Sequence, residues 1–320
     1  MLARILLRAG DYIFVLRPLI LVPVWSFYLL GARSGALAAP PGGAVRVFPA
    51  LACLTLLMAS AYLINQVFDR RTDALNEKGH YLTRGIFSAR WVVGFAVALF
   101  FAAAWVNHTL PAAQRAAMVA ALVLAMAYSL PPARLCARPF LDLLANALGY
   151  GGVAFAAGRA VFDPSLAEAA RASLPWVLLV GATFLHTTIL DVEGDRAAGK
   201  RTTAVAMGAT RAARGAAVLA LAATAAAAAQ WRSTGDTLAL LVTAPLAAAY
   251  ARWAFARWTT PRSSAHAVQG ATALVALAAA WNEPRLLAVV IPLVLIARLY
   301  YRRRFGVPYP GPADDASATA

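Results

Sequence analysis

The sequence predicts an all-α polytopic membrane protein, a bundle of nine to ten transmembrane helices around a central cavity. Hydrophobic residues make up 61% of the 320 residues and charged residues only 13%, whereas soluble proteins carry about 25% charged residues. The apolar residues form blocks of about 20, the length that crosses a ~30 Å hydrocarbon core as an α-helix. The mean hydropathy is +0.65. An ordinary water-soluble domain therefore does not fit this composition.

Ten segments have the length and apolarity of membrane spans. The first follows Arg4 and Arg8, as in a signal peptide, but its apolar run of about 18 residues is too long for a signal-peptide core. The ninth is dominated by Ala, Thr and Gly, so the count falls to nine if this segment lies on the surface. The predicted spans are residues 12–31, 45–65, 90–108, 112–130, 140–158, 174–191, 212–231, 236–256, 264–281 and 285–303.

The basic residues are distributed unevenly about this map. There are 29 Lys and Arg residues against 14 Asp and Glu, and most of the basic residues fall on the side of the N-terminus. Cytoplasmic loops of membrane proteins carry such an excess. We therefore expect a multi-pass protein of the cell inner (cytoplasmic) membrane with both termini cytoplasmic, and no nucleic-acid partner. Residues 1–305 form one predicted domain, and residues 306–320 a disordered cytoplasmic tail.

Six of the fourteen acidic residues form two groups at the ends of the second and sixth predicted spans. Asn65, Asp69 and Asp73 follow one another at intervals of four, which places them on one helix face. Asp191 and Asp195 repeat this interval. Carboxylates at the end of a membrane helix are costly to desolvate and indicate a functional site. Two such clusters facing one cavity suit Mg²⁺, which binds through one or two carboxylates together with phosphate oxygens.

Other polar residues surround these clusters. Basic side chains near the acids could bind phosphate oxygens: Lys78, Arg84, Arg134, Arg138, Lys200 and Arg201. Residues within the spans near the same membrane face could line a cavity or contact an acceptor: Tyr62, Tyr128, Asn146, Tyr150 and His186. Aromatic faces there could stabilise a carbocation. The two cysteines, Cys53 and Cys136, are too few for a disulfide framework and are interpreted as reduced.

Two motifs resemble those of a known family. Residues 65–73, Asn-Gln-Val-Phe-Asp-Arg-Arg-Thr-Asp, resemble the first Asp-rich motif of the UbiA-type intramembrane prenyltransferases, and residues 191–203 closely resemble the second. Residues 128–135 resemble the loop after the family's fourth helix, and residues 16–18 the start of its first helix. The resemblance covers about residues 10 to 300. We call residues 65–73 the first motif and residues 191–203 the second motif.

The resemblance implies a catalytic site for transfer of a polyprenyl group from an allylic polyprenyl diphosphate to an aromatic, chlorin or lipid acceptor, with Mg²⁺ as cofactor and diphosphate as product. By matching position, Asn65, Asp69 and Asp73 would hold one metal ion, and Asp191 and Asp195 the other. The residues implied or expected to contact diphosphate are Asn65, Lys78, Arg84, Arg134, Lys200 and Arg201. The cavity would open laterally to the bilayer, which is itself a partner.

The sequence departs from the family pattern after the first motif. His80 stands where the family usually has Arg, Arg84 replaces a Ser, and Cys136 replaces a common Lys. These changes leave the expected metal ligands intact but put the diphosphate and acceptor contacts in doubt. Two other readings stay open. A cation-coupled transporter would usually place its acids near the membrane midplane, and an intramembrane terpene cyclase would share the metal chemistry without an acceptor.

Overall fold

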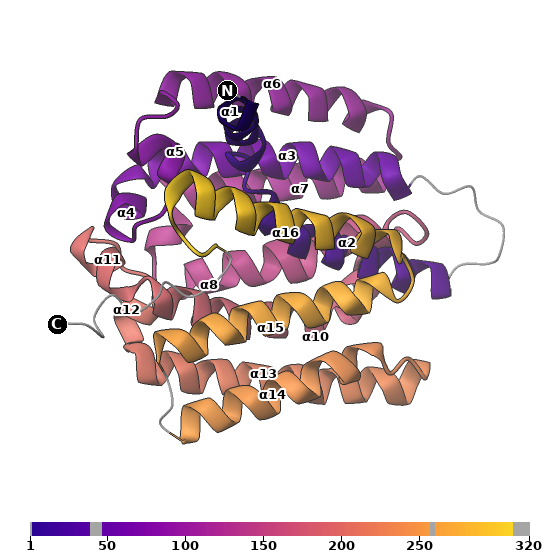
Figure 1. Ribbon diagram of the computed structural model, residues 1–320. Coiled ribbons are helices and arrows are strands. Elements are labelled where there is room, and N and C mark those ends of the chain that lie inside the picture. Colours follow the sequence, from indigo (N-terminus) through magenta and orange to yellow (C-terminus); the bar gives the residue numbers. More distant parts are fainter. Residues whose placement is uncertain (1, 39–46, 257–259, 310–320) are drawn as a thin grey trace.

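The structure, a computed structural model, describes residues 2–38, 47–256 and 260–309, and the secondary structure of these residues is entirely helical (Figure 1). The long helices run side by side as a bundle. They are α2 (Pro18–Ala38), α3 (Val47–Phe68), α6 (Ala89–His108), α7 (Ala112–Ser129), α10 (Leu166–Leu190), α13 (Ala209–Thr234), α14 (Leu238–Phe255), α15 (Pro261–Ala280) and α16 (Arg285–Phe305).

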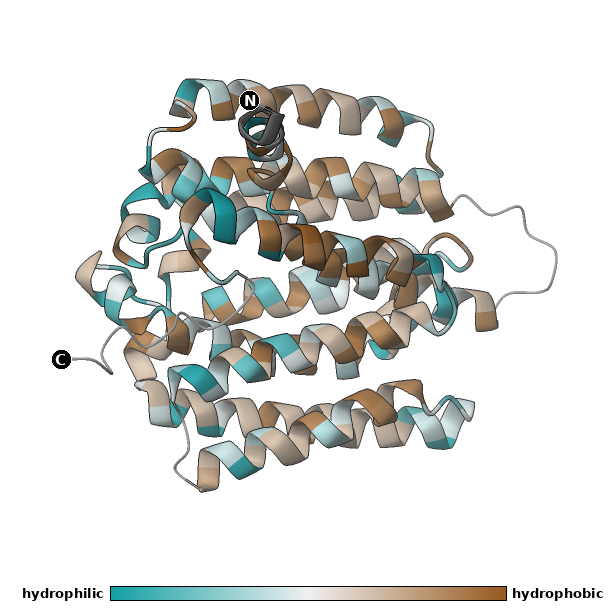
Figure 2. Cartoon of the chain, in the orientation of Figure 1, coloured by the Kyte–Doolittle hydropathy of each residue, from teal (hydrophilic) through white to brown (hydrophobic). Residues whose placement is uncertain are grey.

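The expectation of an all-α polytopic membrane protein is confirmed. Seven helices of the described residues are long and apolar enough to cross a membrane: α2, α3, α6, α7, α10, α13 and α14. Figure 2 shows the apolar residues along these long helices. The predicted fifth, ninth and tenth spans are helical as well, in α8–η2–α9, α15 and α16, but they are not among the seven. The count of nine to ten therefore stays a prediction.

The first predicted span differs from the observed helices, whereas the fifth agrees in its bounds and contains a π-helix. The first span was expected at residues 12–31, but the helix breaks before Pro18, and a separate helix α1 (Leu2–Phe14) precedes it. Arg17, at the break, has a left-handed φ of 54°. A residue before proline avoids the α region, whereas proline suits the first position of a helix. The fifth span is continuous from α8 (Leu141–Asn146) through the π-helix η2 (Ala147–Ala154) to α9 (Phe155–Arg159).

Small residues allow the central helices to approach closely. A Cβ atom on Gly158 of α9 would lie 1.8 Å from the carbonyl oxygen of Tyr28, and one on Gly31 of α2 would lie 1.9 Å from that of Phe155. The two backbones are therefore in direct contact, as is common between membrane helices. In α13 a stripe of fully buried alanines has the same effect toward α10. These helices contribute to the main apolar core.

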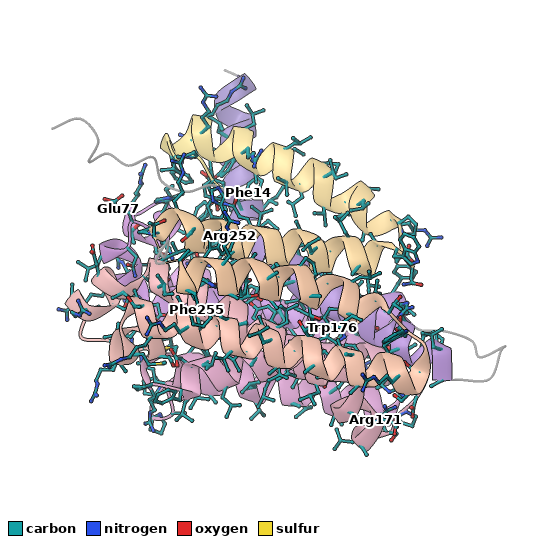
Figure 3. The ribbon with its side chains drawn as sticks, turned by 90° about the horizontal axis from the view of Figure 1, so that it is seen from below. Phe14, Glu77, Arg171, Trp176, Arg252 and Phe255 are labelled. Atoms are coloured by element: carbon teal, nitrogen blue, oxygen red, sulfur yellow. The ribbon has the colours of Figure 1, made fainter. Side chains whose placement is uncertain are left out.

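The two ends of the bundle differ in the short helices that they carry. The short helices α4 (Arg70–Leu75), α5 (His80–Thr83), α11 (Val192–Ala197) and α12 (Thr203–Met207) gather at one end, the left side of Figure 1. In Figure 3 the labelled Glu77 lies at this end and Arg171 at the opposite one. A second apolar cluster, which includes Phe14, Tyr81 and Tyr300, lies near the short helices α1 and α5. The predicted disordered tail falls mainly on residues 310–320, which lie outside the described residues.

Candidate active site

The first motif lies where α3 gives way to α4. Asp69 is the residue between the two helices and is 7% exposed. Asn65, one turn earlier, donates from Nδ2 to Oδ2 of Asp69 at 3.1 Å and to the hydroxyl of Ser129 at 3.1 Å. The amide of Asp73 donates to the carbonyl of Asp69 at 2.8 Å, which continues the helical turn. Asn65 and Asp73 are therefore each hydrogen-bonded to Asp69, but the helix breaks at Asp69, so the continuous helical face that their spacing predicted is interrupted there.

The second motif repeats this local backbone between α10 and α11. Asp191 has φ −106° and ψ 0°, close to the −95° and 8° of Asp69. The amide of Asp195 donates to the carbonyl of Asp191 at 2.8 Å. Five residues after the second aspartate of each motif, the backbone closes in the same way, since the Lys78 amide donates to the Asp73 carbonyl and the Lys200 amide to the Asp195 carbonyl. The two motifs thus present matching aspartates and lysines.

The two motifs meet through their side chains. Nζ of Lys200 lies 3.4 Å from Oδ2 of Asp69, and Lys78 forms an ion pair with Asp191. Nδ2 of Asn76, at the end of α4, donates to Oδ1 of Asp195 at 3.4 Å. A Cβ atom on Gly194 would lie only 2.1 Å from Oδ1 of Asn76, so this glycine permits the approach of the two short helices. Residues more than 100 positions apart in the chain therefore form one site.

Burial and charge shift the proton affinities in this site. Burial raises the pKa of Asp195 to about 6, and the side chain is 3% exposed. Burial lowers the pKa of Lys200, but the carboxylates of Asp69 and Asp195 outweigh this effect and raise the pKa above its ordinary value. Lys200 is therefore a permanent cation beside buried carboxylates, which are expensive to bury without a positive partner.

Two arginines approach the first motif from other parts of the chain. Nη2 of Arg17 lies 2.7 Å from Oδ2 of Asp73, and Nη2 of Arg134 lies 3.5 Å from Oδ1 of Asp69. Both arginines have left-handed backbone, with φ of 54° and 37°, a conformation that costs energy outside glycine and is found at functional sites. Arg134 was expected here. Arg17 was not named as a site residue, although its position before Pro18 belonged to the resemblance.

Asp142 is a second residue that sequence reasoning missed. It is fully buried at the start of α8 and accepts hydrogen bonds from the amide of Thr203 at 2.8 Å and from the Thr203 hydroxyl. Thr203 follows Lys200 by three residues, so Asp142 fixes the segment that carries this lysine. The available signal was a carboxylate inside a predicted span, which by default indicates a functional role.

Other expected diphosphate contacts lie elsewhere. Arg84 lies over the ring of Phe305, with Cζ 5.2 Å from the ring centroid, and the His80 ring packs against the same ring in a tilted arrangement, with centroids 4.8 Å apart. Arg138 donates to the carbonyl of Pro132 at 2.8 Å, and Arg201 is exposed. The unusual residues after the first motif thus face α16. This placement gives a physical account of the departure at His80 and Arg84, because both serve an aromatic contact.

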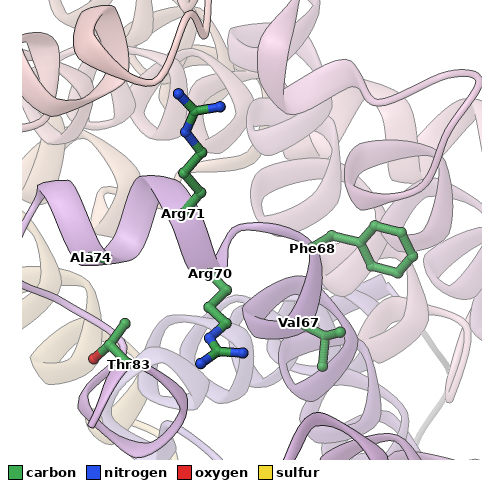
Figure 4. Close-up of a pocket in the computed structure, with 6 residues that line it drawn as sticks. All are labelled: Val67, Phe68, Arg70, Arg71, Ala74 and Thr83. Atoms are coloured by element: carbon green, nitrogen blue, oxygen red, sulfur yellow. The ribbon is translucent and has the colours of Figure 1, made fainter.

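A groove of about 490 Å³ lies beside the first motif (Figure 4). In the close-up, the side chains of Arg70 and Arg71 point in opposite directions. The groove is lined by Val67, Phe68, Arg70, Arg71, Ala74 and Thr83. Four of these residues belong to the first motif, but none of the six was expected to hold metal or diphosphate.

The expected cavity residues form two groups. The hydroxyls of Tyr62 and Tyr150 are 2.7 Å apart, which links α3 to the π-helix η2. Asn146 donates to the carbonyl of Asp142 at 3.0 Å, and Tyr128 is half-buried at the end of α7. His186 is different, because it is 1% exposed and packs against Tyr250 at 4.6 Å and beside Ser264 at 3.3 Å. His186 therefore lies in a separate group of α10, α14 and α15.

The carboxylates fit the donor set that Mg²⁺ requires. Oδ1 of Asp69 is buried and accepts no hydrogen bond within the described part of the chain, although Nη2 of Arg134 lies 3.5 Å away, so this oxygen could still serve as a ligand. Within the described residues, no group of three or more His, Cys, Asp or Glu side chains could hold a metal ion. Mg²⁺ commonly binds one or two carboxylates and completes its shell with waters and phosphate oxygens. This pattern fits the pairs Asp69/Asp73 and Asp191/Asp195.

Comparison with known proteins gives the same picture. A protein of Halobacterium salinarum named lycopene elongase/hydratase is 36% identical over 63% of this chain and 73% of its own. A digeranylgeranylglyceryl phosphate synthase of the same organism is 38% identical over 49% of this chain and 55% of its own. A UbiA homolog from Archaeoglobus fulgidus bound to GPP and Mg²⁺ shares the fold, with a TM-score of 0.65 and 22% identity over 87% of this chain and 100% of that one. The model of the UbiA prenyltransferase family matches residues 21–275. This chain therefore belongs to the UbiA prenyltransferase family and is a multi-pass membrane prenyltransferase.

Proposed function

We propose that this protein transfers a polyprenyl group from an allylic polyprenyl diphosphate to a lipid acceptor that is dissolved in the bilayer, in a Mg²⁺-dependent reaction. The observation that carries this proposal is the reciprocal pairing of the two motifs, in which Lys78 lies against Asp191 and Lys200 against Asp69. The pairing concentrates carboxylates and cations in one place, which is what a diphosphate and its metal ions require.

The aspartates would bind the metal ions, and the lysines would bind the phosphate oxygens. Asn65, Asp69 and Asp73 would hold one Mg²⁺, and Asp191 and Asp195 a second. Bound Mg²⁺ would neutralise the negative charge that develops on the leaving diphosphate. A diphosphate that enters would release Lys78 and Lys200 from their carboxylate partners and give them phosphate oxygens to bind. Arg17 and Arg134 lie beside the first motif and would bind further oxygens through their planar forks.

The chain's own residues would then favour ionisation of the donor. The C–O bond between the allylic carbon and diphosphate breaks, and the electron pair leaves with the phosphate oxygen. The allylic carbon bonds to an electron-rich atom of the acceptor, which loses a proton to complete the exchange. Fixed cations stabilise the departing charge without reorganising. The apolar helices around Tyr62 and Tyr150 would exclude the water that would otherwise capture the allylic cation.

A lipid acceptor is favoured over aromatic and chlorin acceptors. The relatives with the higher identities are named for lycopene elongation and for digeranylgeranylglyceryl phosphate synthesis, and both names refer to isoprenoid lipids. The polar end of the bundle would face the cytoplasm of a cell inner membrane with both termini on that side, as the excess of basic residues there favours.

Diphosphate release by the purified protein tests the proposal. The protein in detergent is given geranylgeranyl or dimethylallyl diphosphate, with and without Mg²⁺. Lycopene, geranylgeranylglyceryl phosphate, homogentisate and a chlorophyllide are then added in turn. Mg²⁺-dependent release that a lipid acceptor stimulates is the expected result. Stimulation by homogentisate or chlorophyllide alone would overturn the acceptor class. Release that needs no acceptor would indicate a terpene cyclase, and no release with any donor would favour the transporter reading.

A further inference from the structure

The first and last helices of the described residues, α1 and α16, contact each other through a buried ion pair. Asp11 in α1 is buried, at 3% exposure, and Arg304 in α16 forms a bidentate ion pair with it. Nε of Arg304 lies 2.9 Å from Oδ1 of Asp11, and Nη2 lies 3.0 Å from Oδ2. Tyr300 also donates its hydroxyl to Oδ1 of Asp11. Both helices lie outside residues 21–275, the part of the chain that the family model matches. The contact therefore involves no residue that the family model matches.

Aromatic packing reinforces this contact. The ring of Phe14 stacks on that of Tyr300 with centroids 4.4 Å apart and an interplanar angle of 19°. A Cβ atom on Gly10 would lie 2.6 Å from Cε2 of Tyr300, so α1 rests directly on this ring. Figure 3 shows the labelled Phe14 beside α1 and α16. The position of the last turn of α1 thus depends on α16.

A short and tightly held segment connects this contact to the carboxylate site. Arg17 follows Phe14 by three residues, its amide donates to the Phe14 carbonyl at 3.1 Å, and its guanidinium reaches Asp73 at 2.7 Å. Between them, Val15 is fully buried and its carbonyl accepts a hydrogen bond from Nε2 of Gln66 at 2.9 Å. Only Val15 and Leu16 separate the two residues, and these hydrogen bonds hold the backbone between them, so a shift of Phe14 is expected to move Arg17.

We propose that Asp11 and Arg304 are positioning residues for the prenyl diphosphate. They fix α1 against α16, and this in turn keeps the Arg17 guanidinium beside Asp73, where it binds the diphosphate of the donor. The inference rests on the proposed function. It gives α16 a role in donor binding although, in the contacts described above, no residue of α16 touches the carboxylates of the two motifs. A purely structural role for the pair would instead affect stability alone.

A double-mutant cycle separates these roles. The affinity of the full-length protein for geranylgeranyl thiolodiphosphate, a slowly ionising donor analogue, is measured with Mg²⁺, together with KM for geranylgeranyl diphosphate and the melting temperature. Arg304→Ala should weaken analogue binding about tenfold, since coupled residues interact by amounts of this order. In an Arg17→Ala background the same change should alter binding less than about twofold. Arg302→Ala, an exposed arginine on the same turn, should leave binding unchanged.

The outcomes discriminate clearly. Equal factors in the two backgrounds, or no weakening by Arg304→Ala in the wild-type background, would overturn the inference while leaving the proposed function intact. If Arg304→Ala does not fold, Arg304→Lys takes its place, because it keeps the charge and loses the fork to both Asp11 oxygens. A wild-type protein that neither binds the analogue nor releases diphosphate would overturn the proposed function and this inference together.

Discussion

Lys200 lies with its ammonium 3.4 Å from Oδ2 of Asp69, although 131 residues separate the two in sequence. The relationship is reciprocal, because Lys78, five residues after the first motif, pairs with Asp191 of the second motif. Each lysine follows the second aspartate of its own motif and contacts the first aspartate of the other. A lysine at or just after each motif therefore supplies a cation to the other motif.

Removal of Lys200 should affect donor use most strongly. Its side chain is 12% exposed, whereas that of Lys78 is 48% exposed, and fixed charges act more strongly where water is excluded. We expect Lys200→Ala to lower kcat/KM for diphosphate release by about 100-fold or more. Lys78→Ala should cost about tenfold. Lys200→Arg is the matched control and should retain much more activity than Lys200→Ala. Similar losses for both lysines would contradict the difference in burial.

The aspartates of both motifs should be indispensable for turnover. Asp69→Ala or Asp191→Ala removes a proposed metal ligand, so we expect loss of detectable diphosphate release with normal membrane insertion. Glu193→Ala changes an exposed carboxylate between Asp191 and Asp195 and should retain activity. Release assays over a range of Mg²⁺ concentrations, with insertion checked by size-exclusion chromatography, test this expectation. Full activity of either aspartate variant would refute the two-motif site.

Asp142 should hold the segment that carries Lys200 in position through its hydrogen bonds with Thr203. Asp142→Ala leaves the amide and hydroxyl of Thr203 without their acceptor in a buried place, and such a loss costs about 1–3 kcal/mol of stability. Asp142→Asn keeps one acceptor oxygen and should cost less. We expect both variants to have a lower melting temperature and a higher KM for the donor than the wild type. Both effects should be larger for Asp142→Ala than for Asp142→Asn. An unchanged KM in a destabilised Asp142→Ala protein would show that Asp142 acts on stability alone.

The contact between α2 and α9 should tolerate no side chain at Gly158. A Cβ atom there would overlap the Tyr28 carbonyl at 1.8 Å, so Gly158→Ala should destabilise the protein by about 2–3 kcal/mol. Gly94 in α6 is an informative control, because nothing lies within 4 Å of a Cβ atom built on it. Gly94→Ala should be neutral or stabilising by up to about 1 kcal/mol through helix propensity. Thermal stability in detergent measures both, and equal melting temperatures would contradict the close approach.

His80 should make the stability of the protein sensitive to mild acid. Burial, followed by the nearby Arg84, lowers the pKa of His80 below its ordinary value of 6.5. The unfolded chain then takes up the proton more readily than the folded protein. Stability is therefore retained above about pH 6.5 and declines as the pH falls through the lowered pKa. We expect the melting temperature to drop between pH 7.5 and 5.5 in the wild type and to drop less in His80→Gln. An equal drop in both would exclude His80 as the origin.

The class of protein and its two motifs could be predicted from the order of residues alone. Apolar blocks of the length of a bilayer predicted the helical bundle, because hydrocarbon leaves the backbone no alternative partner for its hydrogen bonds. The interval of four residues predicted that Asn65, Asp69 and Asp73 share one face, because helix geometry is local. The resemblance of both motifs indicated the family before any fold was available.

Tertiary structure decided which residues share the site. Arg17 reaches Asp73 because the helix breaks before Pro18 and α1 rests on α16, and Asp142 meets Thr203 across 61 residues. His80 and Arg84 stand where the resemblance implies a diphosphate or acceptor contact, yet both face Phe305. Such pairings depend on the packing of distant helices against one another. Sequence periodicity shows the face of a helix on which a residue lies, but the contact between two faces is fixed only when the helices pack.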